Sequence, residues 1–224
     1  MPIFTLNLLF ILSGIFLAMF SKNRYDSFRL DPSNQIIYRY FLASLFVSLA
    51  MFATGIPALV TDNEIILSYS IMLALLFNTV GFNHFFLITV YSKLKAQYFI
   101  IMRYALLIFS FVLLSYCVMS PPAPYIDIYG IAHWRFDPIV GLIAALHMDI
   151  VFAANIFSIL THFYRLKKLS IINTVALVLT FIFAGISGSY LYVGDSSFFL
   201  LLASVGMYLG TGAIFFSVIR KKFI

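Results

Sequence analysis

Charged residues are scarce in this sequence. Only 10% of its 224 residues are charged, 63% are hydrophobic, and the mean hydropathy is +1.04. Soluble domains carry about 25% charged residues, so the composition excludes an ordinary soluble enzyme and predicts an integral membrane protein. Apolar runs of about 20 residues recur, and the short alternating segments of membrane barrels are not seen, which indicates an all-α fold.

Two further absences narrow the chemistry. The single cysteine, Cys117, excludes an intrachain disulfide. The last apolar run, Ser197–Ile219, contains no lysine that could form a retinal Schiff base. The segment "GISG" around Ser187 is similar to intramembrane serine proteases, but no histidine follows it that could act as the base. We therefore expect neither a catalytic centre nor a cofactor.

Seven apolar runs are long enough to cross the roughly 30 Å hydrocarbon core of a bilayer as helices. They are Ile3–Phe20, Tyr38–Val60, Ile66–Tyr91, Tyr98–Met119, Pro138–His162, Ile171–Tyr192 and Ser197–Ile219. The prediction is one domain over residues 1–224, a polytopic seven-transmembrane helix bundle.

The positions of the basic residues predict its orientation. Of 14 Lys and Arg residues, all but Arg135 follow the first, third, fifth and seventh runs or lie at the adjoining helix ends. Because Lys and Arg favour cytoplasmic loops, the N-terminus is predicted outside and the C-terminus inside. The net charge of +6 then reflects topology and contact with anionic lipids, and no nucleic-acid partner is expected.

The outer loop Ser120–Pro138 is the longest on that side and carries two kinds of side chain. Three aromatic residues are expected to anchor it at headgroup depth: Tyr125, Tyr129 and Trp134. Three other residues are weak candidates for a metal site: Asp127, His133 and Asp137. Their spacing matches no strict zinc template.

Asp149 is the one carboxylate in the interior of an apolar run. It lies about eleven residues into the fifth run, and an ionised Asp near the bilayer centre costs about 2.5–3.5 kcal/mol on insertion scales. We therefore expect it to face protein or water, or to be protonated. Helical spacing places it on one face with Ala145, Phe152 and Ala153, and places His147 about 200° away.

Other polar residues lie at similar depths and complete the set of ligand- or proton-binding candidates. Alongside Asp149 and His147 these are Asn78, Asn83, His84, Asn155 and Tyr208. The structural alternative is that they hydrogen-bond between helices, at roughly 0.6 kcal/mol each. The last run also carries a stripe of small residues suited to close helix packing: Ala203, Gly206, Gly210 and Ala213.

Two motifs resemble a known family. "NHFFLITVY" (Asn83–Tyr91) is similar to the pattern that closes the third helix of the seven-helix N-terminal sensor region of bacterial histidine kinases and cyclic-dinucleotide enzymes. "SVIRKKFI" (Ser217–Ile224) resembles the exit of its last helix. The resemblance implies that the chain lies in a bacterial inner membrane. In that family a cytoplasmic output domain follows. Because the sequence ends at Ile224, we expect a stand-alone or truncated sensor module.

Three functions remain open at this point. The leading hypothesis is a sensor or receptor-like module in which a small ligand, lipid or proton shifts helix packing and so signals to a cytoplasmic partner. The alternative is a small transporter or channel that uses a polar layer around Asp149. The third is a scaffold that binds another membrane protein, or a further copy of itself, through the glycine face of the last run.

Overall fold

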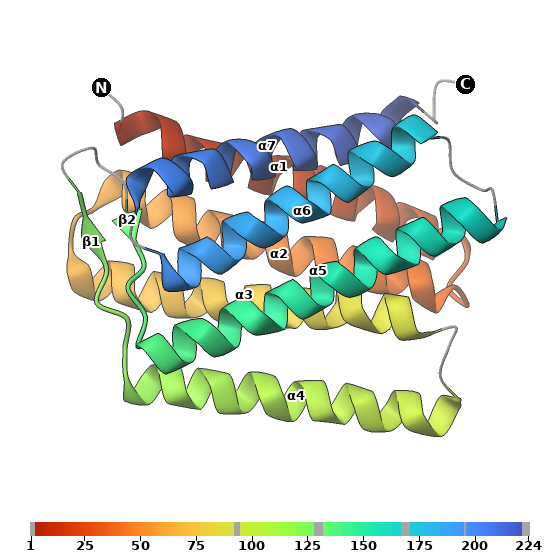
Figure 1. The fold of residues 1–224 in the computed structure, drawn as a ribbon, viewed down its shortest axis with the longest axis horizontal. Coiled ribbons are helices and arrows are strands. Elements are labelled where there is room, and N and C mark those ends of the chain that lie inside the picture. Colours follow the sequence, from red (N-terminus) through yellow and green to blue (C-terminus); the bar gives the residue numbers. More distant parts are fainter. Residues whose placement is uncertain (1–2, 92–94, 128–131, 167–170, 195, 221–224) are drawn as a thin grey trace.

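The computed structural model describes residues 3–91, 95–127, 132–166, 171–194 and 196–220, except for some helical side chains. The described ranges form seven helices and a short hairpin (Figure 1). The helices are α1 (Ile3–Leu30), α2 (Gln35–Val60), α3 (Glu64–Tyr91), α4 (Ala96–Met119), α5 (Pro138–Leu166), α6 (Ile171–Val193) and α7 (Ser197–Arg220). The antiparallel strands β1 (Tyr125–Ile126) and β2 (Ala132–His133) join α4 to α5.

The helices coincide with the predicted apolar runs to within a few residues, with one correction. The first run was expected to end at Phe20, but α1 continues to Leu30. Among the described residues, four helices are long and apolar enough to cross a membrane: Gln35–Val60, Glu64–Tyr91, Ala96–Met119 and Pro138–Thr161. The chain is therefore an all-α protein with transmembrane helices.

Six of the helices form a closed ring. α1 packs against α2 and α7, α3 against α2 and α5, and α6 against α5 and α7. α4 lies outside this ring on α3 and α5 (Figure 1). Accordingly, only three of its side chains are buried: Ser110, Leu113 and Cys117. The side chains that point into the ring, including Met51, Phe82, Met148 and Leu191, make up most of the core.

Side-chain caps begin three of the helices. The Asn34 side chain accepts a hydrogen bond from the backbone N–H of Ile37 at the start of α2, and Asn63 does the same for the first turn of α3. At α5 the Asp137 carboxylate accepts from the N–H groups of Ile139 and Val140. Such caps satisfy donors that the first helical turn leaves unpaired, so they define where each helix starts.

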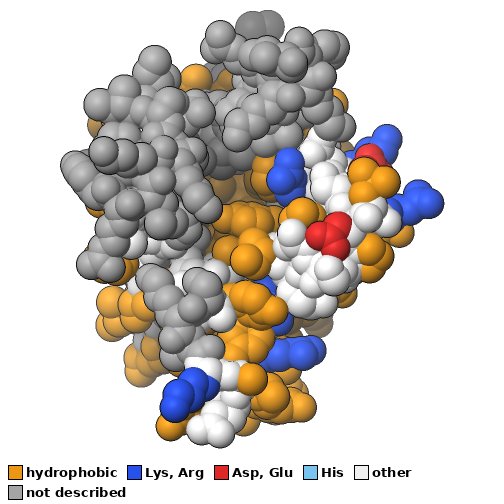
Figure 2. All heavy atoms as spheres, turned by 90° about the vertical axis from the view of Figure 1, so that its right-hand side faces the viewer, with side chains coloured by type: hydrophobic (Ala, Val, Ile, Leu, Met, Phe, Trp, Pro, Cys, Tyr) orange, Lys and Arg blue, Asp and Glu red, His pale blue; other side chains and the backbone are white. Residues whose placement is uncertain are grey.

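The two ends of the bundle differ in charge. α1 begins at the end that carries the β1–β2 hairpin, and α7 ends at the opposite one (Figure 1). Figure 2 shows that opposite end, where Lys and Arg side chains gather around apolar ones. Arg39, in the first turns of α2, is buried, and its guanidinium lies 4.8 Å from the ring centre of Phe99 on α4. The clustering agrees with the charge pattern from which a cytoplasmic face was predicted.

Candidate functional site

Among the described residues, the side chain of Asp149 is not hydrogen-bonded to the other polar candidates. Its side chain lies on the exposed surface of the bundle, where one carboxylate oxygen accepts a hydrogen bond of 2.5 Å from the hydroxyl of Ser189 on α6. Among the described residues, Asn78 bonds to Tyr192 and His147 bonds to Asn83. The expected polar layer centred on Asp149 is therefore not present as one cluster.

The packing of α5 explains this outward position. Its buried stripe runs along Ala144, Met148, Val151 and Asn155, at the three- and four-residue spacing of one helix face. Asp149 is one residue beyond the centre of that stripe and so falls on its edge, beside exposed Leu146 and Ile150. Ala145 and Phe152, with which it was expected to share a face, are buried, whereas Ala153 is exposed.

Asn78 lies inside the ring. Its side chain is 4% exposed, and its amide Nδ2 donates a hydrogen bond of 3.2 Å to the hydroxyl of Tyr192 on α6. Its carbonyl Oδ1 is buried and has no hydrogen-bond partner among the described residues. A buried carbonyl without a partner is uncommon in folded proteins and calls for an explanation.

Asn83 and His147 form a second polar group, at the junction of α3, α4 and α5. The Asn83 Oδ1 lies 3.0 Å from Nε2 of His147, and its Nδ2 donates to the Ser110 hydroxyl at 2.7 Å and to the Leu106 carbonyl at 3.2 Å. The His147 ring also contacts Phe109 of α4. The sequence proposed both residues but not their pairing. Their contacts attach α4 to the outside of the ring.

These placements predict opposite results for two substitutions. Asn83→Ala is expected to lower the free energy of unfolding by about 2 kcal/mol, because it removes three interhelical hydrogen bonds worth roughly 0.6 kcal/mol each. Asp149→Asn is not expected to lower it, because the amide oxygen can still accept from Ser189 and a charge that is costly at this depth is removed. Reversible unfolding in mixed detergent micelles measures both. A loss of stability in Asp149→Asn as large as that in Asn83→Ala would mean that this carboxylate is buried.

The remaining candidates are His84, Asn155 and Tyr208, and each packs against a neighbouring ring or bonds within its own helix. His84 stacks on Phe46 with ring centres 6.3 Å apart, and Asn155 donates to the Val151 carbonyl of its own helix. Tyr208 packs its ring on Phe16, between α7 and α1. These contacts are those of helix packing, and none of the three residues lines the ring cavity described below.

The small-residue stripe of α7 lies partly within the described side chains. A Cβ atom added at Gly206 would lie 3.0 Å from the Cβ of Phe183, so α7 approaches α6 closely at this point. Gly210 is buried. The side chains of Ala203 and Ala213 lie outside the described set. Gly206 thus serves packing within the chain.

An apolar cavity of about 70 Å³ lies inside the ring. Every ring helix contributes to its wall, and α4 does not: the lining residues are Leu17, Val47, Met51, Asn78, Phe82, Phe85, Met148, Phe152, Phe181, Gly188, Leu191, Tyr192, Met207 and Thr211. Asn78, Tyr192 and Thr211 supply its polar groups, and no charged residue lines it. The Thr211 hydroxyl is already bonded to the Tyr208 carbonyl.

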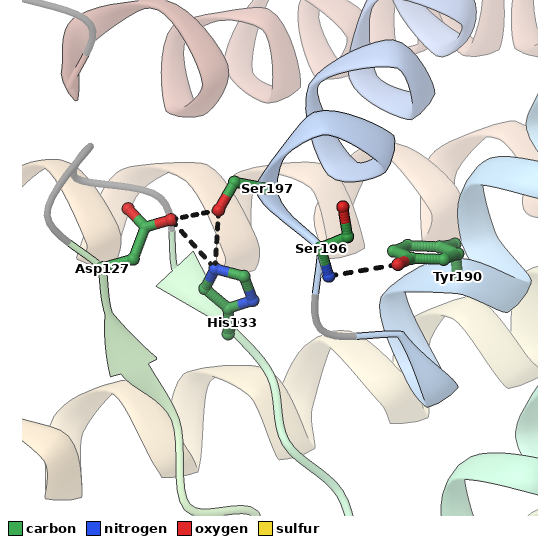
Figure 3. Close-up of polar contacts among 5 residues, drawn as sticks. All are labelled: Asp127, His133, Tyr190, Ser196 and Ser197. Carbon is green, nitrogen blue, oxygen red and sulfur yellow. Dashed lines mark hydrogen bonds and ion pairs between the residues drawn. The ribbon is translucent and has the colours of Figure 1, made fainter.

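A polar cluster lies at the hairpin end (Figure 3). The carboxylate of Asp127 accepts a hydrogen bond from the Ser197 hydroxyl at the start of α7, and the same oxygen lies 3.1 Å from Nε2 of His133. His133 is 1% exposed and stacks on Tyr125 with ring planes 3° apart. The cluster therefore attaches the hairpin to α7.

Its geometry does not suit catalysis by serine. In a Ser–His–Asp triad the histidine bonds the acid with one ring nitrogen and the serine with the other. Here Ser197 and Asp127 both approach Nε2, and the serine hydroxyl donates directly to the carboxylate. His133 cannot then pass a proton from one to the other.

Of the three residues proposed to bind a metal ion, Asp127, His133 and Asp137, one has another role. Asp137 caps α5, and among the described residues no three His, Cys, Asp or Glu side chains come together in a group that could hold a metal ion. Asp127 and His133 are brought together as the hypothesis required. Their third partner is Ser197, a residue that the spacing argument did not consider.

Trp134 links the hairpin to the cavity. Its side chain is 2% exposed, so it is not the interfacial anchor that was expected. Its ring packs 5.6 Å from that of Tyr192, whose hydroxyl bonds Asn78. Tyr129, another expected anchor, lies outside the described residues. Contacts therefore run without a break from the hairpin through Tyr192 to the cavity wall.

Four hydroxyl residues of these sites were missed in the sequence: Ser110, Ser189, Tyr192 and Ser197. Ser110 lies inside an apolar run and the other three lie near the ends of such runs. Single hydroxyl side chains are ordinary in both places, so no local signal marks them. No family model, curated protein or solved structure matches this chain.

Proposed function

We propose that the chain is a membrane-embedded sensor module in which a small ligand occupies the ring cavity and alters the packing of the ring helices. One observation carries this proposal: residues of all six ring helices line the cavity. A ligand there contacts every helix of the ring, and it can shift an equilibrium between two packings if it binds one of them better.

The direction of signalling follows from the contacts at each end. Tyr192 of the cavity wall packs on Trp134 at the hairpin end. The ring helices run from there to the basic end of the bundle. In this proposal the chain crosses a bacterial inner membrane seven times, with the basic end in the cytoplasm facing a signalling partner. The resemblance to kinase-associated sensor regions supports the same arrangement.

The test fills the ring cavity with a larger side chain in place of a ligand and measures whether the helices move. In a Cys117→Ala background, spin labels at Ser33→Cys and Thr161→Cys report the distance across the basic end of the ring. Filling the cavity by Thr211→Leu, or independently by Gly188→Ala, is expected to shift that distance by about 1–2 Å, the size of known interface helix shifts. The Cβ added at Gly188 would lie 1.8 Å from Cε of Met148, a flexible cavity-lining side chain that must then move. Gly185→Ala is the control, because its added Cβ would make only ordinary contact with Phe152. Unchanged distances in both filled variants would overturn the proposal.

The transporter alternative rested on Asp149 lining a path, and that residue faces outward. Proteoliposomes that contain a pH-sensitive dye are expected to show no proton flux above that of empty liposomes. Flux that disappears in Asp149→Asn would restore the transporter hypothesis in place of the sensor.

A further inference from the structure

Basic side chains from three helices lie close together at the basic end of the bundle. The charge of Arg103 on α4 acts on Arg39 of α2, and both charges act on His84 of α3. The guanidinium of Arg39 is also held against Phe99, one turn before Arg103 on α4. Because like charges at short range repel, two arginines in this arrangement call for an anion between them.

Arg39 is a buried cation without a counter-ion. Its side chain is 7% exposed. Within the part of the chain that the structure describes it forms no ion pair, and its Nε is a buried donor without a hydrogen-bond partner. The two carboxylates that precede it in the chain, Asp26 and Asp31, are exposed. Burying an unpaired charge is strongly unfavourable, so an anion from outside the chain would stabilise this arrangement.

The donors of the two arginines indicate which anion fits. A guanidinium presents five N–H groups in a planar fork that matches the oxygens of a carboxylate or a phosphate. In Arg39 only Nε is enclosed, and the two Nη atoms, which carry four of the five hydrogens, are not. Arg103 is exposed and offers a second fork from another helix. A carboxylate has two oxygens and can satisfy one fork, whereas a phosphate can present one pair of oxygens to each arginine.

The depth of the two arginines also favours phosphate. Arg39 lies in the first turns of α2 and Arg103 in the second turn of α4, near the starts of two helices that are long and apolar enough to cross a membrane. Lipid phosphates lie at this level, just outside the hydrocarbon core. Exposed apolar side chains continue along α4 beyond Arg103, among them Leu107 and Ile108, and suit contact with acyl chains. Basic pockets between transmembrane helices bind the head groups of anionic lipids.

We propose that Arg39 and Arg103 form a binding site for a phosphate group, with one pair of phosphate oxygens on each guanidinium, at the basic end of the bundle. The head group of an anionic lipid and a free phosphate ion offer this same chemistry. Neither arginine lines the ring cavity, so the site is independent of the proposed function.

Phosphatidic acid and diacylglycerol with the same acyl chains test the site, because they differ only in the phosphate. The full chain in detergent micelles is titrated with each lipid, and native mass spectrometry counts the bound lipids. The wild type is expected to bind its first phosphatidic acid at about tenfold lower concentration than diacylglycerol, because hydrogen bonds to charged groups are worth at least that factor. Arg39→Gln and Arg103→Gln are each expected to remove this preference.

Arg29→Gln is the matched control. It removes an exposed basic residue from the last turn of α1, so it lowers the net charge by the same amount and should keep the preference. Because Arg103 is exposed, Arg103→Gln serves if Arg39→Gln does not fold. Excess inorganic phosphate distinguishes the two sources: loss of bound phosphatidic acid from the wild type would assign the site to a free phosphate ion, and its retention would assign the site to a lipid.

Equal binding of the two lipids by the wild type would overturn the inference. A preference that survives in Arg103→Gln, and in Arg39→Gln where that variant folds, would do the same. Loss of the preference in Arg29→Gln as well would mean that phosphatidic acid is attracted by the net charge of this end, and would also overturn a site built on two arginines.

Discussion

Gly141→Ala is expected to lower the free energy of unfolding by about 3 kcal/mol, although it adds a single methyl group. The added Cβ would lie 2.4 Å from the backbone carbonyl oxygen of Tyr192 and 3.3 Å from its carbonyl carbon. Because these are backbone atoms, the clash is relieved only if α6 moves away from α5. Overpacking of this kind costs about 1–3 kcal/mol, and a clash with backbone belongs at the upper end.

The same movement would displace Tyr192 from Asn78 and from Trp134, so the variant should also lose the cavity on which the proposed function rests. Unfolding in mixed detergent micelles gives the stability, and Trp134 emission reports the change at Tyr192. Gly185→Ala is the matched control on α6: its Cβ would lie 3.5 Å from Phe152, an ordinary contact. It should leave stability unchanged or raise it by up to about 1 kcal/mol through helix propensity. If the two variants behave alike, α5 and α6 are not as close as the structure places them.

The helices themselves could be predicted from the sequence because hydropathy reports them directly. Apolar runs separated by polar turns give both the number of helices and their bounds. The exception is instructive: residues 21–30 are polar, yet they continue α1 to Leu30. Hydropathy predicts where a chain can be buried in lipid, but it does not predict where a helix ends, which depends on backbone hydrogen bonds and caps.

The candidate site was only partly predictable, because helical periodicity gives the angles between side chains on one helix but not the direction of the bundle centre. It correctly separated Asp149 from His147, and the two lie in different surroundings. It could not show that the centre of the ring lies nearer Met148, so Asp149 was expected inside. A rotation of α5 by a fraction of one residue would have reversed this outcome.

Pairings between helices depend on tertiary structure in the same way. Asn83 and His147 were both candidates, and no property of either run indicated that they meet. Trp134 was expected at the membrane surface because of its residue type. It is buried because its ring packs against Phe136 and against Tyr192 of α6.

Asp127→Ala, in the cluster that attaches the hairpin to α7, is expected to lower the free energy of unfolding by a similar amount, about 3 kcal/mol. It removes the carboxylate that accepts from Ser197 and contacts His133, and it leaves the buried His133 Nε2 without that acceptor. Removing the partner of a buried donor costs about 1–3 kcal/mol, and more when a charged group is involved. The hairpin would then be held on α7 less tightly.

Hydrogen exchange separates this effect from general loss of stability. In Asp127→Ala the backbone amides of residues 132–136 and of the first turn of α7 should exchange faster, while those of α3 facing α2 should follow only the change in global stability. Asp127→Asn keeps an acceptor and should retain most of the protection. Asp137→Ala is the control within the same loop, because it removes only the cap of α5 and should cost about 1 kcal/mol. If Asp127→Ala is no more destabilising than Asp137→Ala, then the cluster of Figure 3 does not hold the hairpin on α7, and the contact from Trp134 to Tyr192 would have to be maintained by apolar packing alone.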